Sequence, residues 1–421
     1  MQTQWGQSHL SGVTDKQQAQ CRQRLQTFTD ELLAPLGRSE RRHWGSVYVR
    51  GLLLDGERKS VGAMAARLPD GNEQNLQQFL NQSPWAWEPL WQSLAQRVER
   101  AFSPPLAWVI DDTGFPKKGE HSVGVQRQYS GTLGKKGNCQ VATSLHRTDG
   151  RGSSPLGFRL YLPESWTSDA PRLESTGVPK QIVFQEKWRL ALSLIDEALA
   201  WGLARPEAVL ADAGYGDTTA FREELEQRAL PYAVGITRDV VVWAEPPTYA
   251  VPHGKGTGRP PKCVRYGEQK PTSVKELATA QQKRFRRVTW REGSRGPMSS
   301  RFWATRVLPA HGWSNGQPPG KEVWLLVEWP VSETEPTKSY LCDLPKTLRV
   351  KRLVTIARGR WRVEQDYQQL KEELGLDHFE GRGWTGWHHH VTLVMLAHLF
   401  LRLEQQRRSS KRKVDAAADP A

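Results

Sequence analysis

The sequence of 421 residues contains few cysteines, and none of them is spaced for cross-linking or for zinc binding. The four cysteines lie far apart and form no C-x-x-C pair: Cys21, Cys139, Cys263 and Cys342. This spacing argues against a disulfide framework and against a zinc ribbon. It is typical of a protein that works in a reducing compartment.

A long hydrophobic run is also missing. The longest apolar stretch extends from Val391 to Leu403, and Thr392, His398 and Arg402 interrupt it. It is too short to span a bilayer, so it predicts a buried helix. The N-terminal segment MQTQWGQSHLSG lacks the charged-then-apolar layout of a signal peptide. We therefore expect a cytoplasmic location and no membrane partner.

Acidic residues are scarce relative to basic ones. The chain has 59 Lys and Arg against 45 Asp and Glu, a formal net charge of +14. Such an excess favours a polyanionic partner, and nucleic acid is the most common partner of this kind. Hydrophobic residues make up 38% and charged residues 25%, which indicates a globular rather than a disordered chain.

The pattern of apolar residues changes along the chain. Spaced apolar residues predict helices first, and short apolar runs alternating with helices then predict a mixed β-sheet flanked by helices. Three further strand-like segments follow a loop rich in Pro and Gly. The predicted regions are N-terminal helices (1–102), the first part of an α/β core (103–243), a β-rich insertion (244–345), the C-terminal helices of the core (346–405) and a basic disordered tail (406–421).

Two short helices in the N-terminal region have the layout of a helix-turn-helix. Ser60 can cap the first helix, a Pro-Asp-Gly segment at 69–71 ends it, and the second helix carries Leu76 and Leu80. Polar Gln and Asn side chains fall on the outer face of the second helix. Such a pair reads DNA in many proteins, but it also occurs as an ordinary hairpin in helical bundles. Both interpretations stay open from sequence.

Two aspartates follow apolar runs where strands are expected to end. Asp111 comes directly after one run and Asp212 after another. Because neighbouring side chains on a strand point to opposite faces, only one of Asp111 and Asp112 faces a site. Asp111 is favoured because it shares its face with Thr113, and Asp112 is the alternative. Glycines after Asp212 allow the backbone to approach a neighbour closely.

A third carboxylate, Glu364, falls on a predicted amphipathic helix. At about 100° per residue, the apolar residues form one narrow stripe. The stripe consists of Ile356, Val363, Tyr367, Leu370 and Leu374. Arg360, Glu364 and Lys371 lie at about 40°, 80° and 60° from its reference residue, along one edge. From there a carboxylate can reach a metal and the two cations can hold phosphate oxygens. The alternative is a solvated pattern of charges that contributes roughly a few tenths of a kcal/mol per pair.

Two strand-end carboxylates and one helix carboxylate form the ligand set of a two-metal phosphodiesterase site. Mg²⁺ prefers oxygen ligands, and two ions about 3.5–4 Å apart clamp the attacking and leaving oxygens of a phosphate. We therefore expect Asp111, Asp212 and Glu364 to be catalytic residues that bind two Mg²⁺ ions, for which Mn²⁺ can substitute. Lys117 and Lys118 are further candidates for DNA phosphate contacts, with simple solvation as the alternative.

Several segments closely resemble one branch of bacterial insertion-sequence transposases of the DDE class. These segments are VIDDTGFPKKG, VGVQRQYSGTLGKKGNCQVA and VLADAGYGD. Around the third carboxylate, the wider family has Tyr, two residues, Arg, three residues, Glu, six residues and Lys. Arg360, Glu364 and Lys371 match this spacing, whereas Ala357 stands at the Tyr position. The resemblance covers residues 40 to 405, most of the chain.

This resemblance implies an RNase H-like catalytic core with a β-rich insertion before the last catalytic helix, and N-terminal helices that bind DNA. The implied activity is cut-and-paste DNA transposition, in which the protein binds terminal inverted repeats and catalyses metal-dependent strand cleavage and strand transfer. The implied partners are double-stranded DNA, at the element ends and at the target, and a second copy of the chain. The protein would then be associated with the nucleoid when bound to DNA.

Two alternatives to a transposase stay open from sequence. One is a catalytically inactive DNA-binding protein derived from such an enzyme, and the other is an RNase H-like nuclease without strand transfer. Within the insertion, Trp290 and Trp303 are candidates to stack on an extruded base, with packing inside the sheet as the alternative.

Overall fold

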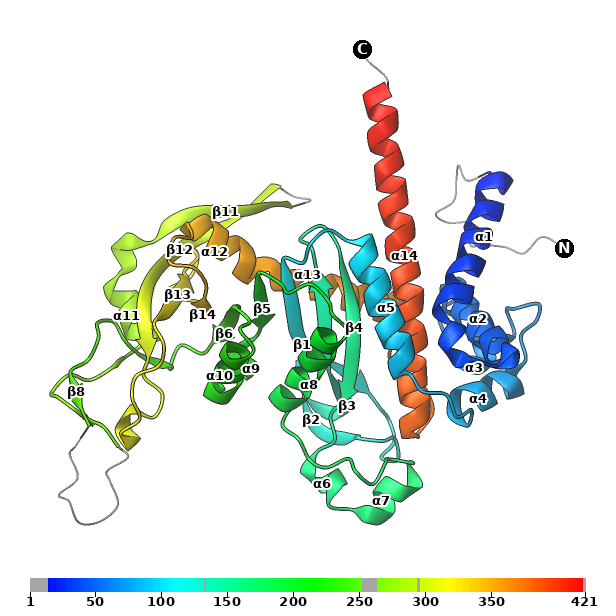
Figure 1. The fold of residues 1–421 in the computed structure, drawn as a ribbon, viewed down its shortest axis with the longest axis horizontal. Coiled ribbons are helices and arrows are strands. Elements are labelled where there is room, and N and C mark those ends of the chain that lie inside the picture. Colours follow the sequence, from blue (N-terminus) through cyan, green and yellow to red (C-terminus); the bar gives the residue numbers. More distant parts are fainter. Residues whose placement is uncertain (1–13, 132–133, 252–262, 294–295, 419–421) are drawn as a thin grey trace. The chain divides into compact units, whose positions relative to one another are not determined.

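The structure is a computed structural model that describes residues 14–131, 134–251, 263–293 and 296–418. Within it the chain forms two compact units (Figure 1). The first unit consists of Met1–Pro104, Asp111–Ala204 and Arg362–Ala421, and the second of Pro105–Ile110 and Arg205–Trp361. Strand β1 (Ala107–Pro116) therefore contributes residues to both units.

The helical part of the first unit is assembled on one long helix, α14 (Figure 1). Its helices are α1 (Asp15–Leu32), α2 (Ser39–Leu53), α3 (Val61–Ala65), α4 (Glu73–Asn81), α5 (Glu88–Ala101) and α14 (Trp384–Ala418). α14 contacts α1, α2, α4 and α5, and its residues 391–400 are all buried. This confirms the buried helix that the sequence predicts there. No described helix is long and apolar enough to cross a membrane.

The end of α14 differs from the prediction. A disordered tail is expected over residues 406–421, but the helix continues to Ala418. Residues 419–421 lie outside the described part. The physical reason is helix propagation, because a long helix that is already formed adds Lys, Arg and Ala residues at little cost.

The first unit also contains antiparallel strands covered by helices. In addition to β1, its strands are β2 (Gln126–Ser130), β3 (Lys135–Thr148) and β4 (Ser153–Leu160). β3 pairs with both β2 and β4, lies next to β1, and is buried from Cys139 to Thr148. α8 (Lys187–Ala200) packs on β3 and β4, while α5 and α14 pack on β4. The short helices α6 (Glu164–Thr167) and α7 (Ala170–Ser175) follow β4.

The second unit begins as a parallel sheet and continues as an antiparallel one. β5 (Ala208–Ala211) pairs in parallel with the start of β1 and with β6 (Tyr232–Ile236). β6 then pairs antiparallel with β14 (Lys338–Asp343), which continues to β13 (Val323–Glu328) and β12 (Gly296–Pro309). The remaining strands are β7 (Val241–Trp243), β8 (Tyr249–Ala250), β9 (Arg265–Tyr266), β10 (Thr272–Ser273) and β11 (Arg286–Gly293). The β-rich segment therefore lengthens the sheet of this unit.

The helices of the second unit are short. They are α9 (Ala213–Gly216), α10 (Thr219–Gln227), α11 (Val274–Ala280) and α12 (Val350–Ala357). The three strands expected between residues 286 and 329 are present as β11, β12 and β13. The sequence prediction missed both α11 and β14, although α11 begins with a capping box formed by Ser273 and Glu276.

The strand order supports the predicted fold class. It is β4, β3, β1 in the first unit and β1, β5, β6 in the second, and β5 pairs in parallel with both of its neighbours. A mixed sheet flanked by helices confirms the α/β prediction and fits an RNase H-like core with a β-rich insertion before its last helices.

The helix expected to carry Arg360, Glu364 and Lys371 is not continuous. After α12 the chain forms a 3-10 turn at Arg358–Arg360, then α13 (Trp361–Gln368), then a wide π turn at Gln369–Glu373. Gly359 is buried, and a Cβ at this position would lie 3.3 Å from Leu210 Cδ1. This close packing against β5 explains the tightened turn, which an ideal helical wheel does not represent.

Candidate active site

Asp111 and Asp112 are adjacent on β1 and have different surroundings. Asp111 is only 8% exposed, and its Oδ1 accepts a hydrogen bond from the main-chain N–H of Asp112 at 2.9 Å. Asp112 Oδ1 accepts a hydrogen bond from Thr143 Oγ1 at 3.1 Å, and its Oδ2 forms an ion pair with Lys187 Nζ at 2.7 Å. β3 and α8 thus engage Asp112 inside the first unit. Asp111 remains the predicted ligand of the two.

Asp212 directly follows β5 in the second unit and begins α9. Its side chain accepts the N–H of Gly214 at 3.0 Å and so caps this short helix. A Cβ on Gly216 would lie only 1.8 Å from the carbonyl oxygen of Gly235 on β6. Glycine is therefore required at position 216, because any side chain there would clash with the main chain of Gly235. This close approach, which the glycines after Asp212 suggest in sequence, fixes the turn that carries the carboxylate.

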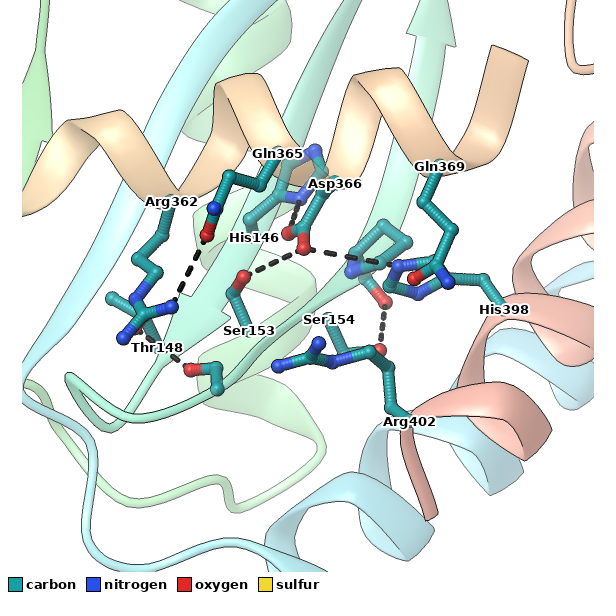
Figure 2. A network of polar contacts seen from close by, with 12 residues as sticks. His146, Thr148, Ser153, Ser154, Arg362, Gln365, Asp366, Gln369, His398 and Arg402 are labelled. Atoms are coloured by element: carbon teal, nitrogen blue, oxygen red, sulfur yellow. Dashed lines mark hydrogen bonds and ion pairs between the residues drawn. The ribbon is translucent and has the colours of Figure 1, made fainter. Parts of the chain in front are cut away.

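Glu364 lies in the first turn of α13, and its side chain is exposed. Two residues later, Asp366 points into a buried polar network (Figure 2). Asp366 Oδ2 accepts a hydrogen bond from His146 Nδ1 at 2.8 Å, and Oδ1 accepts one from Ser153 Oγ at 2.6 Å. His398 Nε2 on α14 lies 3.7 Å from the same Oδ1. Asp366 therefore ties the helix of Glu364 to β3, β4 and α14.

The protonation of this network follows from its burial and its hydrogen bonds. Burial raises the pKa of Asp366, but the hydrogen bond from His146 and the contacts with His398 and Ser153 outweigh it, so the pKa lies below its ordinary value. Burial lowers the pKa of His398 to about 4, so this ring is neutral at neutral pH. The charge on Asp366 is thus stabilised mainly by donated hydrogen bonds.

Ser144 connects the strand of Asp111 with the helix of Glu364. Its Oγ donates to the main-chain oxygen of Asp111 at 3.3 Å and lies 2.5 Å from the hydroxyl of Tyr367. Tyr367 is on α13, three residues after Glu364. A single side chain on β3 therefore links the two elements of the first unit that carry predicted metal ligands.

The three lysines predicted to contact phosphates differ in their surroundings. Lys371 Nζ donates to the carbonyl oxygen of Gly114 at 2.8 Å, and Lys117 Nζ donates to that of Phe379 at 2.5 Å. Burial lowers the pKa of both ammonium groups. Lys118, in contrast, is exposed. Lys371 and Lys117 thus bind backbone carbonyls within the fold, and Lys118 is the most accessible of the three for a phosphate.

Arg360 lies in the second unit and is half-buried in the 3-10 turn. Ala357, which occupies the position of the family tyrosine, is 3% exposed and belongs to the core. Its neighbour Arg358 forms an ion pair with Glu328 at 3.3 Å, and its guanidinium carbon lies 4.7 Å from the centre of the Trp290 ring. The segment before Glu364 therefore packs on the extended sheet of its own unit.

The two tryptophans considered for base stacking both have partners inside the second unit. Trp303 is 7% exposed, and its ring centre lies 6.1 Å from that of Phe285. Trp290 is half-buried and lies edge-on to Phe302, with ring centres 5.7 Å apart. These contacts agree with packing inside the sheet, the alternative interpretation from sequence.

The predicted site residues are divided between the units. Asp111, Glu364, Lys371, Lys117 and Lys118 belong to the first unit, and Asp212 and Arg360 belong to the second. Within the described ranges, no three His, Cys, Asp or Glu side chains are grouped as a ready-made metal site. The donors themselves fit, because all three predicted ligands offer the carboxylate oxygens that Mg²⁺ prefers.

Sequence reasoning missed the role of Asp366 and of its partners His146, Ser153 and His398. At about 100° per residue, Asp366 falls about 80° from the centre of the apolar stripe, on the edge opposite Glu364. That position indicates a partly buried acid. Nothing local indicates the partners, which lie 220, 213 and 32 residues away along the chain.

The fold places the chain among α/β proteins with an RNase H-like core. The family of DDE superfamily endonucleases matches residues 31–297, more than half of the chain, and the chain belongs to this family. The matched segment includes Asp111 and Asp212 and ends before Glu364.

A curated relative is also similar to this chain. A probable transposase for insertion sequence element IS701 from Microchaete diplosiphon is 31% identical over 188 residues. The aligned part makes up 44% of this chain and 46% of the relative. The chain thus spans about half the length of this curated relative.

Proposed function

We propose that the protein is the DNA transposase of an insertion sequence, which binds the terminal inverted repeats and catalyses metal-dependent cleavage and strand transfer. One observation carries most of this proposal. In the second unit, Val109 on β1 pairs with Leu210 on β5. Asp111 and Asp212 each follow their paired residue by two positions, so they occupy equivalent places along the two strands, although β5 ends before Asp212 and β1 continues past Asp111 to Pro116.

Asp111, Asp212 and Glu364 would hold two Mg²⁺ ions in this proposal, with Mn²⁺ as a substitute. Bound Mg²⁺ supplies an acidified water and a counter-charge for the phosphate oxygens. Other residues of the chain would hold the elements that carry these carboxylates in place. The pair between Asp112 and Lys187 fixes the strand of Asp111, and the Asp366 network fixes the helix of Glu364.

The proposed reaction consists of two phosphoryl transfers of the same kind. Water attacks the phosphodiester at the element end, the phosphorus–oxygen bond to the 3′-oxygen breaks, and a 3′-hydroxyl is released. That hydroxyl then attacks a phosphodiester of the target, and a new bond forms as the target strand is cut. Arg360 and Lys371 would orient the phosphates. Because two ends must be held together, the active complex would contain at least two copies of the chain.

Cleavage of labelled DNA tests the proposal directly. The substrates are duplexes that carry the DNA on either side of the coding sequence, incubated with Mg²⁺ or with EDTA. We expect metal-dependent cutting at the element boundary by the wild type, and at least about 1000-fold slower cutting by Glu364→Ala, on the order expected for removal of a metal ligand. Glu372→Ala is the matched control, because Glu372 is exposed nearby and accepts a hydrogen bond from Gln368.

The products separate the proposal from its two alternatives. Joined products in the presence of a target plasmid support a transposase, and cutting without joining points to a nuclease. Tight binding by the wild type without cutting in Mg²⁺ or in Mn²⁺ contradicts the proposal and leaves a DNA-binding protein.

A further inference from the structure

A pocket of about 190 Å³ lies between α2 and α4 in the first unit, and none of the candidate site residues lines it. Polar side chains dominate its lining. They are Arg38, Glu40 and Arg41 from the start of α2, Asn75, Gln78 and Gln82 from α4 and its C-cap, and Ser83; Trp44, Phe79 and Pro84 complete the lining. The pocket therefore combines charge on one wall with amides on the other.

The amide wall is one face of α4. Asn75, Gln78 and Gln82 are spaced by three and four residues, so their side chains share one face of the helix. Leu76 and Leu80 lie on another face of the helix and are buried, and the buried Phe79 lines the pocket beside the amides. In the described part of the chain, the side-chain amides of Asn75, Gln78 and Gln82 form no hydrogen bond. The fold thus orients three amides toward the pocket without using them.

The charged wall is the N-terminal turn of α2. Arg38 is its N-cap residue and provides no side-chain cap, so the first N–H groups of the helix lack a capping side chain. Such a helix end attracts anions. Neither Arg38 nor Arg41 forms an ion pair with another described residue. Glu40 also lines the pocket and reduces the positive charge there, and among the described residues it forms no ion pair with either arginine.

We propose that this pocket and its rim bind duplex DNA at the element ends: the pocket takes one backbone phosphate against Arg38 and Arg41, and the exposed Gln78 and Gln82 read base edges. The proposal rests on the proposed function, because it names the surface that selects the DNA to be cut. α3 and α4 then act as a helix-turn-helix in which α4 enters the major groove. Amide side chains bind adenine there through two hydrogen bonds, while arginines on phosphates position the helix.

Fluorescence anisotropy with labelled duplexes in EDTA tests this inference apart from catalysis. The probes are duplexes of the DNA flanking the coding sequence, and scrambled duplexes of the same composition. Two double variants remove the two walls: Gln78→Ala with Gln82→Ala, and Arg38→Ala with Arg41→Ala. Two matched controls, Gln74→Ala and Arg42→Ala, change exposed residues on the same two helices that do not line the pocket.

The two double variants have different expected effects. The glutamine variant loses about 5- to 100-fold of its preference for the flanking duplex, while its binding to scrambled DNA stays unchanged. The arginine variant binds both duplexes more weakly. The slope of log affinity against log salt concentration falls by about 1 for each phosphate that the variant no longer binds. Both controls behave as the wild type, and thermal unfolding shows that all variants remain folded.

Two results would overturn the inference. One is a wild type that binds flanking and scrambled duplexes equally, and the other is a glutamine variant whose preference equals that of Gln74→Ala. The proposed function is judged separately, by cleavage in Mg²⁺. If the wild type cuts at the element boundary and the glutamine variant does so equally, only the inference fails. If the glutamine variant loses specific binding but the wild type never cuts, only the proposed function fails.

Discussion

The two units position their carboxylates by different physical means. In the first unit, the helix of Glu364 is fixed by a buried, charged side chain, Asp366, with hydrogen bonds from His146 and Ser153. In the second unit, Asp212 is positioned by backbone, where Gly216 meets Gly235 without room for a side chain. Side-chain hydrogen bonds depend on protonation, whereas a glycine contact depends on volume. The two units should therefore respond to different perturbations.

Buried histidines make this difference larger. His388, His389, His390 and His398 lie on α14 in the core of the first unit. Each of the first three donates to a carbonyl oxygen: His388 to that of Trp384, His390 to that of Gly375, and His389 to that of Leu80 or that of Trp85, since a neutral ring has one N–H. In the described part of the second unit, the one histidine is His311, which is exposed. Acid should therefore act on the first unit.

The largest expected effect is a drop in the first unit's stability in mild acid. Burial lowers the pKa of His388 to about 3, and that of His389, His390 and His398 to about 4. The unfolded chain has its histidine pKa near 6.5, so between about pH 6.5 and pH 4 the unfolded state binds more protons. Each neutral buried histidine then lowers the free energy of unfolding by on the order of 3 kcal/mol near pH 4, a large part of the stability of a typical domain.

Urea unfolding at several pH values, with hydrogen exchange to locate the change, measures this effect. The free energy of unfolding should be highest above pH 6.5 and should fall as the pH approaches 4. As the pH is lowered, hydrogen exchange should become faster in α14 at a higher pH than in β12 and β13. His398→Leu should move the acid transition to lower pH, and His311→Leu should leave it in place. Equal stability at pH 7 and pH 4.5 would show that the comparison of the two units is wrong.

The second effect is that of removing the Asp366 carboxylate. Replacing Asp366 by Ala removes the buried acceptor of both His146 and Ser153, which should cost about 3–5 kcal/mol. Asp366→Asn keeps one acceptor oxygen and should cost less. Urea unfolding at pH 7 gives the free energies, and hydrogen exchange should report loosening of α13 and β4. A decrease in stability below about 1 kcal/mol for Asp366→Ala would mean that the network does not fix the helix.

The third effect tests the backbone contact of the second unit. Gly216→Ala forces a Cβ into the Gly235 carbonyl, and such overpacking typically costs about 1–3 kcal/mol. Gly320→Ala is the matched control, because its added Cβ would make only ordinary contacts at 3.4 Å. We expect Gly216→Ala to lower the free energy of unfolding by the same amount at pH 7 and at pH 5. Hydrogen exchange should locate the loosening in β5 and β6. A destabilisation that grows in acid would instead assign pH sensitivity to both units.

The parts of this fold that sequence predicts are those with local causes. The apolar runs before Asp111 and Asp212 predict strands that β1 and β5 confirm, because burial on both faces selects a continuous apolar run. The prediction of one ideal helix for Arg360, Glu364 and Lys371 is wrong. Gly359 packs against Leu210, which is far away along the chain, and that approach tightens the turn.

The candidate site shows the same limit. The carboxylates themselves are visible in the sequence because Asp111 and Asp212 each follow an apolar run and Glu364 lies on a recognisable helix. The strand end predicted at Asp111 is wrong, because β1 continues to Pro116. The surroundings that distinguish Asp111 from Asp112 are not visible in the sequence, because Lys187 and Thr143 approach from other elements. The Asp366 network is hidden for the same reason. Long-range hydrogen bonds between polar side chains leave no periodic pattern, and only the folded chain brings them together.

The smallest expected effect is one in which the units should not differ. Thr14 begins α1 and Ser273 begins α11, each with a complete capping box at the surface of its unit. Thr14→Ala and Ser273→Ala should each cost about 1 kcal/mol, because each leaves backbone N–H groups without a capping oxygen. Urea unfolding and local hydrogen exchange measure both. Similar destabilisation by the two substitutions would mean that the units differ in their cores and not in their helix ends, whereas an effect confined to one cap would place part of the difference at the surface.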